Sequence, residues 1–378
     1  MLKRLCLLTL MLMSAVANAD STDQLVNDVV HDYMQENDVP GVAVMIYTNG
    51  KPATYYFGMA DRATKKPINK DTIFELGSVT KVMTTLMLAQ DLDYARMKLN
   101  DPIKKYIPTL PDTFSHITVR SLATHTSGLP LNLPSEIKTR TAWENQYAVN
   151  WHPGSAPDES YQYSNVGIGL IGQALEKVAH ANFNTLYRKN ILKPLGMQPI
   201  ALTVPAKLTM HYATGYRSNG TPAPREGEGL FPAAYGVKAS AGDMQKFLSA
   251  AIGLPSTPTN IFYPMRMTQT PYVSVNGSAQ GLGWQIHDLS GWGTTRSLMK
   301  GNDLLGLNAY PVSDVYGDPV FHGTELIDKT GTTAGFRAYI AVLPDKKSGI
   351  VMLANRTATD ASIVKASREI LFKLNGII

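Results

Sequence analysis

The amino-acid sequence predicts an α+β fold: an antiparallel sheet built from both ends of the chain and flanked by helices, with a mainly helical region inserted between them. Strand-like apolar segments joined by tight turns occur near both ends. The middle of the chain instead has helical patterns separated by Pro- and Gly-rich loops. No linker divides the sequence, so we expect one domain over 20–378, with sheet at about 20–77 and 320–378 and mainly helix and loop at about 78–319.

The elements near the N-terminal end follow from their patterns. A first helix is expected over about 22–36, and the apolar segment 41–47 predicts a buried strand. Asn-Gly at 49–50 is typical of a hairpin turn, after which 54–57 returns as a second strand. A helix followed by a hairpin is therefore expected at this end.

The C-terminal end has the same kind of pattern. Residues 336–343 and 350–354 predict two strands, and the Pro- and Gly-containing segment between them predicts a turn. Thr359 or Asp360 is expected to cap a closing helix that runs to about Leu374. Between the two ends, helices are expected near 78–94, 117–124, 166–180 and 241–252.

The first 19 residues have the features of a cleaved export signal. Lys3 and Arg4 form a short positive region, 5–13 is almost wholly apolar, and Ala-Asn-Ala at 17–19 is a small-residue cleavage site. The mature chain is therefore expected to begin at Asp20 and to act outside the cytoplasm.

The same segment bears on membrane attachment and on disulfides. The apolar run is too short to span a bilayer and no later segment is long enough, so no membrane anchor is expected after cleavage. Cys6 is the only cysteine and would leave with the signal, so the mature protein would have no disulfide. A lipid anchor on Cys6 is the alternative; it is disfavoured because Cys6 precedes the apolar core of the signal.

Composition excludes several classes of partner. Hydrophobic residues make up 44% of the chain and charged residues 17%, which is ordinary for a soluble globular protein. The formal net charge of +5 becomes +3 when the two signal cations are removed, and the remaining cations are scattered. We therefore expect no nucleic acid as a partner. The eight histidines lack the paired spacing of zinc sites, so we expect no metal.

Three short motifs occur in a fixed order: Ser-Val-Thr-Lys at 78–81, Tyr-Ser-Asn at 163–165 and Lys-Thr-Gly at 329–331. Each alone is weak evidence, because short patterns of common residues arise by chance. Together they supply a nucleophile, a base, a second polar pair and a cationic strand, which are the parts needed to open an amide through an acyl-enzyme. The three motifs therefore favour an enzyme.

The first motif begins a strongly apolar helical segment, so Ser78 is expected in the first turn of a buried helix. Its backbone N–H is then unpaired within the helix and can face a developing oxyanion. Lys81 lies one turn further on the same face, and burial beside other cations would lower its pKa and let it accept a proton. The alternative, a capping serine with a surface lysine, is disfavoured because the helix is so apolar.

The second motif lies in a loop that enters a helix, which would point Tyr163 and Asn165 to the same side, into a cleft. A phenol beside two ammonium groups loses its proton more easily than it does in water. Taken alone, Tyr163 would more often be a loop tyrosine with a hydrogen-bonded hydroxyl.

The third motif opens a strand whose edge can pair with a peptide-like substrate. Gly331 allows close approach, Lys329 supplies positive charge, and the Thr332 N–H can complete an oxyanion pair with the Ser78 N–H. The alternative is an ordinary strand start with a glycine bulge.

Two other patterns are set aside. Gly-x-Gly-x-x-Gly at 167–172 resembles a dinucleotide-binding loop, but no buried strand precedes it and no acidic residue follows about 20 positions on, so it is read as a helix face that packs closely. A Ser-His-Asp triad with His125 is possible on paper, but no Gly-x-Ser-x-Gly turn accompanies it.

With these motifs the sequence resembles the serine β-lactamases and penicillin-binding proteins, which carry Ser-x-x-Lys, a middle polar motif and Lys-Thr-Gly in this order. The resemblance is closest to class C β-lactamases and extends over nearly the whole mature chain. Tyr-x-Asn in place of Ser-Asp-Asn, and the lack of a Glu-x-x-Leu-Asn segment, argue against class A. Beyond the motifs it rests on the segments 40–44, 73–78, 234–238, 281–284 and 349–355.

The resemblance implies a β-lactamase/transpeptidase-like fold, a single catalytic domain and a role for each motif residue. Ser78 would attack the lactam carbonyl while Lys81 and Tyr163 share the proton transfers. The N–H groups of Ser78 and Thr332 would hold the oxyanion, and deacylation would use a water activated near Tyr163.

The resemblance also implies how the substrate is bound. Asn165 would orient Lys81 and the amide side chain of the substrate. Lys329 and Thr330 would stabilise the phenol and the substrate carboxylate. Tyr235 would form a wall of the pocket.

Several residues depart from the class C pattern. Asn132 stands where a glutamine is usual, a shorter side chain that can still meet the substrate amide. Asp360 and Ile363 stand where Asn and Arg often read the substrate carboxylate, and we expect Arg337 to replace that charge in substrate binding. The loop 124–128 is closer to those of related esterases and peptidases. We therefore expect an altered substrate preference or slower turnover.

Three functions remain open. The leading one is a periplasmic β-lactamase that hydrolyses cephalosporins and penicillins, working as a monomer on small-molecule substrates without a cofactor. The second is a D-alanyl-D-alanine carboxypeptidase or a small-ester hydrolase on the same scaffold; such esterases commonly lack the Lys-Thr-Gly that is intact here. The third is a penicillin-binding sensor that stays acylated at Ser78, disfavoured because no anchor or partner domain accompanies the exported chain.

Overall fold

The computed structural model describes residues 21–227, 229–301 and 308–378. The expected signal segment, its cleavage site and Cys6 lie outside the described residues. An N-terminal helix occupies 21–36, close to its expected position. Within the described parts of the chain, no helix is both long enough and apolar enough to cross a bilayer.

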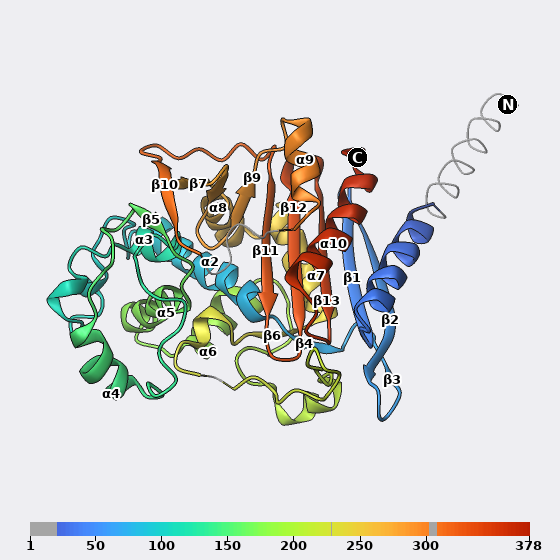
Figure 1. Cartoon of the computed structure of the whole chain (residues 1–378), viewed down its shortest axis with the longest axis horizontal. Coiled ribbons are helices and arrows are strands. Elements are labelled where there is room, and N and C mark those ends of the chain that lie inside the picture. Colours follow the sequence, from blue (N-terminus) through green and yellow to red (C-terminus); the bar gives the residue numbers. More distant parts are fainter. Residues whose placement is uncertain (1–20, 228, 302–307) are drawn as a thin grey trace, which may run out of the picture.

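The centre of the fold is a large antiparallel sheet in the order β3-β2-β1-β13-β12-β11-β9-β8-β7-β10-β5 (Figure 1). Its central part comes from both ends of the chain, which pair directly: Val44 lies opposite Met352 on one side and Tyr55 on the other. The expected α+β architecture is confirmed. The strands from the two ends are β1 (Gly41–Thr48), β2 (Lys51–Asp61), β3 (Lys66–Pro67), β11 (Leu326–Thr332), β12 (Arg337–Leu343) and β13 (Ser348–Ala354).

The sheet extends further than the sequence predicted, because strands from the middle of the chain continue it beyond β11. Most of these have only two or three residues, too few to show an apolar alternation. They are β9 (Gln285–His287), β8 (Ser278–Gln280), β7 (Val273–Val275), β10 (Tyr310–Val315) and β5 (Ser160–Tyr161). A separate small sheet pairs β4 (Ile73–Glu75) with β6 (Lys238–Ser240).

The four helices expected in the middle of the chain are present, and side-chain caps begin several of them. Ser164 accepts a hydrogen bond from the Gly167 N–H at the start of α5, and Thr359 accepts one from the Ser362 N–H at the start of α10. The helices are α2 (Thr80–Asp93), α3 (Val119–Ala123), α4 (Arg140–Ala142), α5 (Asn165–Ala179), α6 (Phe183–Tyr187), α7 (Ala241–Ile252), α8 (Thr259–Thr268), α9 (Trp292–Leu298) and α10 (Asp360–Leu374).

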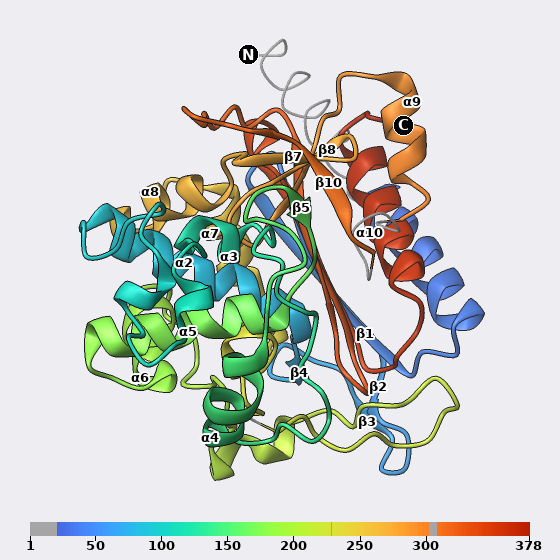
Figure 2. The same cartoon turned by 60° about the vertical axis from the view of Figure 1, so that its left-hand side comes forward.

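Both faces of the central strands β1, β12 and β13 are largely buried. Successive side chains of a strand point to opposite faces, so Val44 joins a core with the N-terminal helix and α10, whereas Met45 joins the larger core with α2, α5 and α7. Figure 2 shows the sheet between these two layers. Strand β11 follows the same alternation, with Leu326 on the α10 side and Ile327 on the other. Two chemically different clusters can therefore lie on the two faces of one strand.

Candidate active site

The three sequence motifs converge around the side chain of Lys81. Ser78 lies in a short 3₁₀ turn, η1 (Gly77–Val79), that leads directly into α2. The Lys81 Nζ lies 3.0 Å from Ser78 Oγ, and it donates to Asn165 Oδ1 at 2.5 Å and to the Ala234 carbonyl at 2.9 Å. An ammonium has three N–H donors, so all three are committed in this arrangement.

Lys81 is fully buried, as the apolar helix predicted. Burial, opposed by the negative charge of Tyr163 and reinforced by the charge of Lys329, lowers the pKa of Lys81 to about 8. The lysine is therefore poised to change protonation near neutral pH, which a solvated lysine is not.

Tyr163 lies between two ammonium groups. The Nζ atoms of Lys81 and Lys329 are 4.9 Å and 5.0 Å from the centre of its ring. Burial by itself raises the pKa of Tyr163, but the charges of Lys329 and Lys81 outweigh it and lower that pKa to about 8. Ser78 and Lys329 also lie near the phenol oxygen, but neither meets it with ordinary hydrogen-bond geometry, so charge is the main cause of the shift.

Two glycines bring β11 against the turn that carries Ser78. Gly77 has φ of 49°, and a Cβ there would lie 2.4 Å from the Thr332 backbone nitrogen. A Cβ at Gly331 would lie 2.0 Å from the Leu76 carbonyl oxygen. Gly331 therefore lets β11 approach the turn that carries Ser78. This contact places the backbone of Thr332 beside that of Ser78.

The Lys-Thr-Gly segment is an open strand edge for part of its length. Strand β9 pairs with β11 only from Leu326 to Asp328, whereas β12 pairs with it through Thr332. Among the described strands, none continues beside 329–332 on the β9 side. An extended ligand can therefore add to this edge next to Ser78. The Lys329 ammonium also donates to the Thr330 carbonyl at 2.9 Å.

Asn132, Asn165 and Tyr235 line one cavity of about 310 Å³. The Asn165 amide donates to Asn132 Oδ1 at 2.7 Å, and the Asn165 N–H donates to the Leu131 carbonyl at 2.8 Å. These bonds hold the Asn132 loop against the second motif. Apolar side chains complete the lining, among them Leu133, Leu230 and Phe231.

Arg337 differs from the expectation that it would offer positive charge to a substrate. It is largely buried, and its Nε lies 2.9 Å from Asp360 Oδ1. The Thr332 hydroxyl donates to the same oxygen at 2.7 Å. Ile363 is fully buried in the core on the α10 side of the sheet. The charge of Arg337 is therefore already paired within the protein.

Sequence reasoning missed the part played by His125. Its ring centre lies 4.4 Å from that of Tyr163, and its Nδ1 accepts a hydrogen bond from the Ser164 N–H at 3.2 Å. Burial, together with the positive charges of Lys81 and Lys329, holds the pKa of His125 well below its usual range, so the ring is neutral. The Ser-His-Asp triad considered from the sequence is not formed, because His125 Nδ1 accepts the Ser164 N–H instead of bonding to a carboxyl group.

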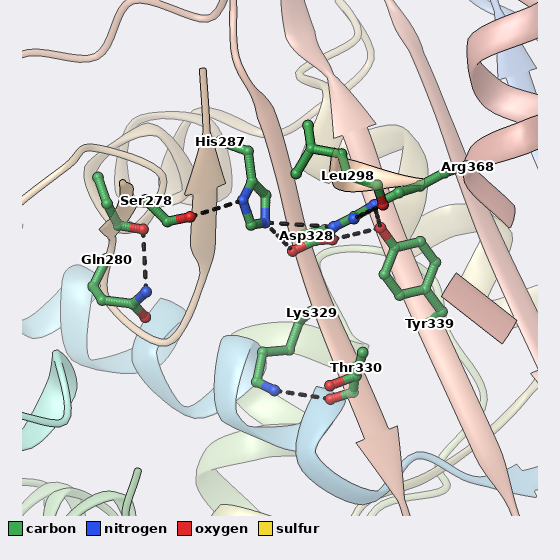
Figure 3. Close-up of polar contacts among 10 residues, drawn as sticks. Ser278, Gln280, His287, Leu298, Asp328, Lys329, Thr330, Tyr339 and Arg368 are labelled. Atoms are coloured by element: carbon green, nitrogen blue, oxygen red, sulfur yellow. Dashed lines mark hydrogen bonds and ion pairs between the residues drawn. The ribbon is translucent and has the colours of Figure 1, made fainter. Parts of the chain in front are cut away.

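The other face of β11 carries a second buried cluster (Figure 3). Asp328 is fully buried and pairs with the guanidinium of Arg368, with the Tyr339 hydroxyl and, at 3.2 Å, with His287 Nε2. Arg368 also donates to the Leu298 carbonyl at 2.6 Å. This cluster ties β9, β11 and β12 to α10 and α9. In the described residues, no three His, Cys, Asp or Glu side chains gather as metal ligands do.

Comparisons with known proteins identify the family and the fold. The Beta-lactamase family model matches residues 26–374. A β-lactamase of Pseudomonas fluorescens is 33% identical over 92% of this chain and 97% of its own length. A class C β-lactamase solved in complex with cefoxitin has a TM-score of 0.88 and 31% identity, covering 94% of this chain and 99% of its own.

A third relative carries two activities in its name. The solved β-lactamase/D-alanine carboxypeptidase of Pseudomonas syringae has a TM-score of 0.87 and 31% identity, and the match covers 93% of this chain and 98% of the other. A family model that spans nearly the whole described chain, with a relative above 30% identity over most of both lengths, establishes descent. The chain therefore belongs to the β-lactamase family.

Proposed function

We propose that this protein is a class C-like serine β-lactamase, which hydrolyses the β-lactam amide of cephalosporins and penicillins through an acyl-enzyme on Ser78. The observation that carries the proposal is the position of the Ser78 hydroxyl. It lies 3.0 Å from Lys81 Nζ and next to a phenol whose pKa is lowered to about 8. A serine needs such a neighbour to lose its proton at neutral pH.

Acylation begins with the Tyr163 phenolate as the base. All three donors of the Lys81 ammonium are engaged, so the lysine has no lone pair to offer Ser78 in this arrangement. The Ser78 oxygen bonds to the lactam carbonyl carbon as its proton passes to Tyr163. The lactam C–N bond then breaks, and the nitrogen takes that proton from Tyr163. Lys81 stabilises the phenolate by charge.

The backbone N–H groups of Ser78 and Thr332 are proposed to hold the oxyanion. Gly77 and Gly331 bring these two backbones together, and the turn leaves the Ser78 N–H without a partner in its own helix. Deacylation reverses the roles: Tyr163 takes a proton from water as the water oxygen bonds to the acyl carbon, and the Ser78 oxygen takes that proton from Tyr163 as its ester bond breaks.

The rest of the proposed site binds the two ends of the substrate. Asn132, Asn165 and Tyr235 line the cavity that would take the acylamide side chain. Lys329 and Thr330 lie on the open edge of β11 and would contact the substrate carboxylate. The backbone of Gly331 would pair with the substrate along the same edge.

The proposal extends to the form in which the protein works. We place it in the periplasm as a single catalytic domain, 20–378, after cleavage of an export signal at residue 19, without an anchor, a cofactor or a nucleic-acid partner. It would act as a monomer on small-molecule β-lactams. N-terminal sequencing of the exported protein and its mass in solution test these points.

Mass measurement of the purified protein mixed with a cephalosporin tests the chemistry. We expect an adduct of the substrate mass that disappears rapidly while open-ring product accumulates. An adduct that persists at Ser78 would instead identify a penicillin-binding sensor or a peptidase. No adduct and no product would contradict β-lactam hydrolysis and leave a small-ester hydrolase.

A D-alanyl-D-alanine carboxypeptidase is the second candidate. The open edge of β11 beside Ser78 favours it, because a peptide can pair there as an added strand. Release of D-alanine from an acyl-D-alanyl-D-alanine peptide measures that activity. We expect this rate to lie well below the rate of cephalosporin hydrolysis, and the opposite order would reverse the two candidates.

A further inference from the structure

We propose that the Asp360 carboxylate is a fixed negative charge beside Thr332, the last residue of β11. This charge makes the protein discriminate against substrates that carry a carboxylate at this end of the site. The inference rests on the proposed acyl transfer at Ser78. Asp360 is the first residue of α10, and its position brings a negative charge to the last residue of the strand that carries Lys329.

The contacts of one oxygen atom carry the proposal. Asp360 Oδ1 accepts the Thr332 hydroxyl at 2.7 Å and lies 2.9 Å from Arg337 Nε. Thr332 and Arg337 face each other across the β11–β12 ladder, so the carboxylate closes the end of this strand pair. Any other anion that used the Thr332 hydroxyl or Arg337 would have to displace Asp360.

Exposure decides which charge an arriving ligand meets. The side chain of Asp360 is 54% exposed, whereas that of Arg337 is 10% exposed. The cation is therefore covered, and the anion faces solvent. Arg337 holds Asp360 in place rather than offering its own charge to a ligand.

The two ends of the segment 329–332 thus have opposite effects on an anion. Lys329, like Lys81, pairs with no carboxylate among the described residues and lies beside the phenol of Tyr163, so it attracts negative charge. Asp360 repels it a few residues away. Like charges that lie close together at a partly exposed site change affinity by roughly 10-fold. A substrate that is neutral at the Thr332 end avoids this loss, which favours esters and amides of the usual carboxylate.

A helix-capping role is the competing explanation, because a carboxylate at the first position of a helix is favourable without any ligand. Asp360→Asn separates the two. The amide oxygen can still accept the Thr332 hydroxyl and still lies at the start of α10, so the substitution removes mainly the charge. Asp345→Asn is a matched control: Asp345 is also exposed and in the first turn of a short helix, beyond the opposite end of β12.

The test compares acylation of Ser78 by one cephalosporin as its free acid and as its carboxylate methyl ester. The rate constant is read by mass, so a protein that acylates but does not turn over still reports. We expect the acid-to-ester ratio to rise roughly 10-fold in Asp360→Asn and to stay at the wild-type value in Asp345→Asn. High salt should narrow the difference in this ratio between the wild type and Asp360→Asn, because it screens the charge of Asp360.

Other outcomes overturn the inference. An unchanged ratio, or equal losses with both substrates, would leave Asp360 as a helix cap. Failure of the proposed function looks different: the wild type would acylate without releasing product, while the ratio in Asp360→Asn could still rise. Absence of acylation in every variant would overturn both proposals.

Discussion

The two faces of strand β11 carry two buried clusters that differ in how their polar groups are paired. On one face, Asp328 is surrounded by Arg368, His287 and Tyr339. On the other, the next residue along the strand, Lys329, lies with Lys81 beside a phenol oxygen without a hydrogen-bond partner in the described parts of the chain. Figure 3 shows both residues on the same strand.

This difference separates a structural cluster from the one that we propose to be reactive. Burial raises the pKa of Asp328, but Arg368 and His287 hold that pKa well below its usual range, so the carboxylate stays charged and paired. The phenol and ammonium of the other face have pKa values moved toward neutral pH instead. The Tyr163 hydroxyl, left short of partners, can exchange a proton with a substrate, whereas the paired carboxylate of Asp328 would lose stabilising contacts in doing so.

Replacement of Ser78 gives the largest expected change in activity and almost none in stability. Ser78→Ala removes the nucleophile, so turnover of a cephalosporin should fall on the order of 10⁶-fold, and no adduct should form. The melting temperature should stay near the wild-type value, because the buried Lys81 ammonium keeps two of its three partners, Asn165 and the Ala234 carbonyl. Ser297→Ala, at an exposed serine of α9, is the control for activity. An adduct on Ser78→Ala would place the nucleophile elsewhere.

Replacement of Arg368 should have the opposite effect, a large loss of stability with a much smaller change in activity. Arg368→Met leaves the buried Asp328 without its main counter-charge, and breaking such a pair typically costs about 3–5 kcal/mol. Denaturant unfolding measures the loss. Lys373→Met breaks the pair of Lys373 with Glu369 on the same helix, where both side chains are partly exposed, and should cost under about 1 kcal/mol. Equal losses of unfolding free energy in the two variants would contradict the structural role of the Asp328 cluster.

The sequence predicted the central strands and the proximity of Ser78 to Lys81, for reasons that are local. Three strands can be recognised in the sequence because both their faces are buried and apolar: 41–47, 336–343 and 350–354. The strands β7, β8 and β9 do not, because three residues pair only through tertiary contacts that the sequence does not display. The sheet was therefore expected to be narrower than it is.

The same limit applies to the site. Ser78 and Lys81 are one helical turn apart, so their contact follows from spacing alone. The pairing of Arg337 with Asp360 depends instead on how α10 lies against β12, and the sequence suggested a free arginine. His125 lies far from the second motif in the chain, and only the fold brings its ring against Tyr163.

Replacement of Lys329 should move the pH dependence of acylation. In the proposed mechanism acylation requires the Tyr163 phenolate, so its rate should rise with pH through an ionisation near pH 8. Lys329 lowers the pKa values of both Tyr163 and Lys81, so Lys329→Gln should raise both and shift the rising limb to higher pH, by about one unit. A pH profile of single-turnover acylation measures the shift. Lys346→Gln, at an exposed lysine, should leave it unchanged. A shift to lower pH would contradict the assignment of Tyr163 as the base.

The smallest effect is expected at His125, which connects the reactive cluster to the backbone. His125 has φ of 62°, and its Nδ1 pairs with the buried Ser164 N–H. His125→Asn keeps a short acceptor and a residue that tolerates positive φ, whereas His125→Leu keeps neither. The Leu variant should therefore lose about 1–3 kcal/mol more unfolding free energy than the Asn variant. Its acylation rate should also fall further, because the loop before α5 carries Tyr163. Equally large losses of acylation rate in the two variants, despite unequal stabilities, would mean that the ring acts on Tyr163 directly, because both variants lack it. The boundary between the two clusters would then pass through His125 itself.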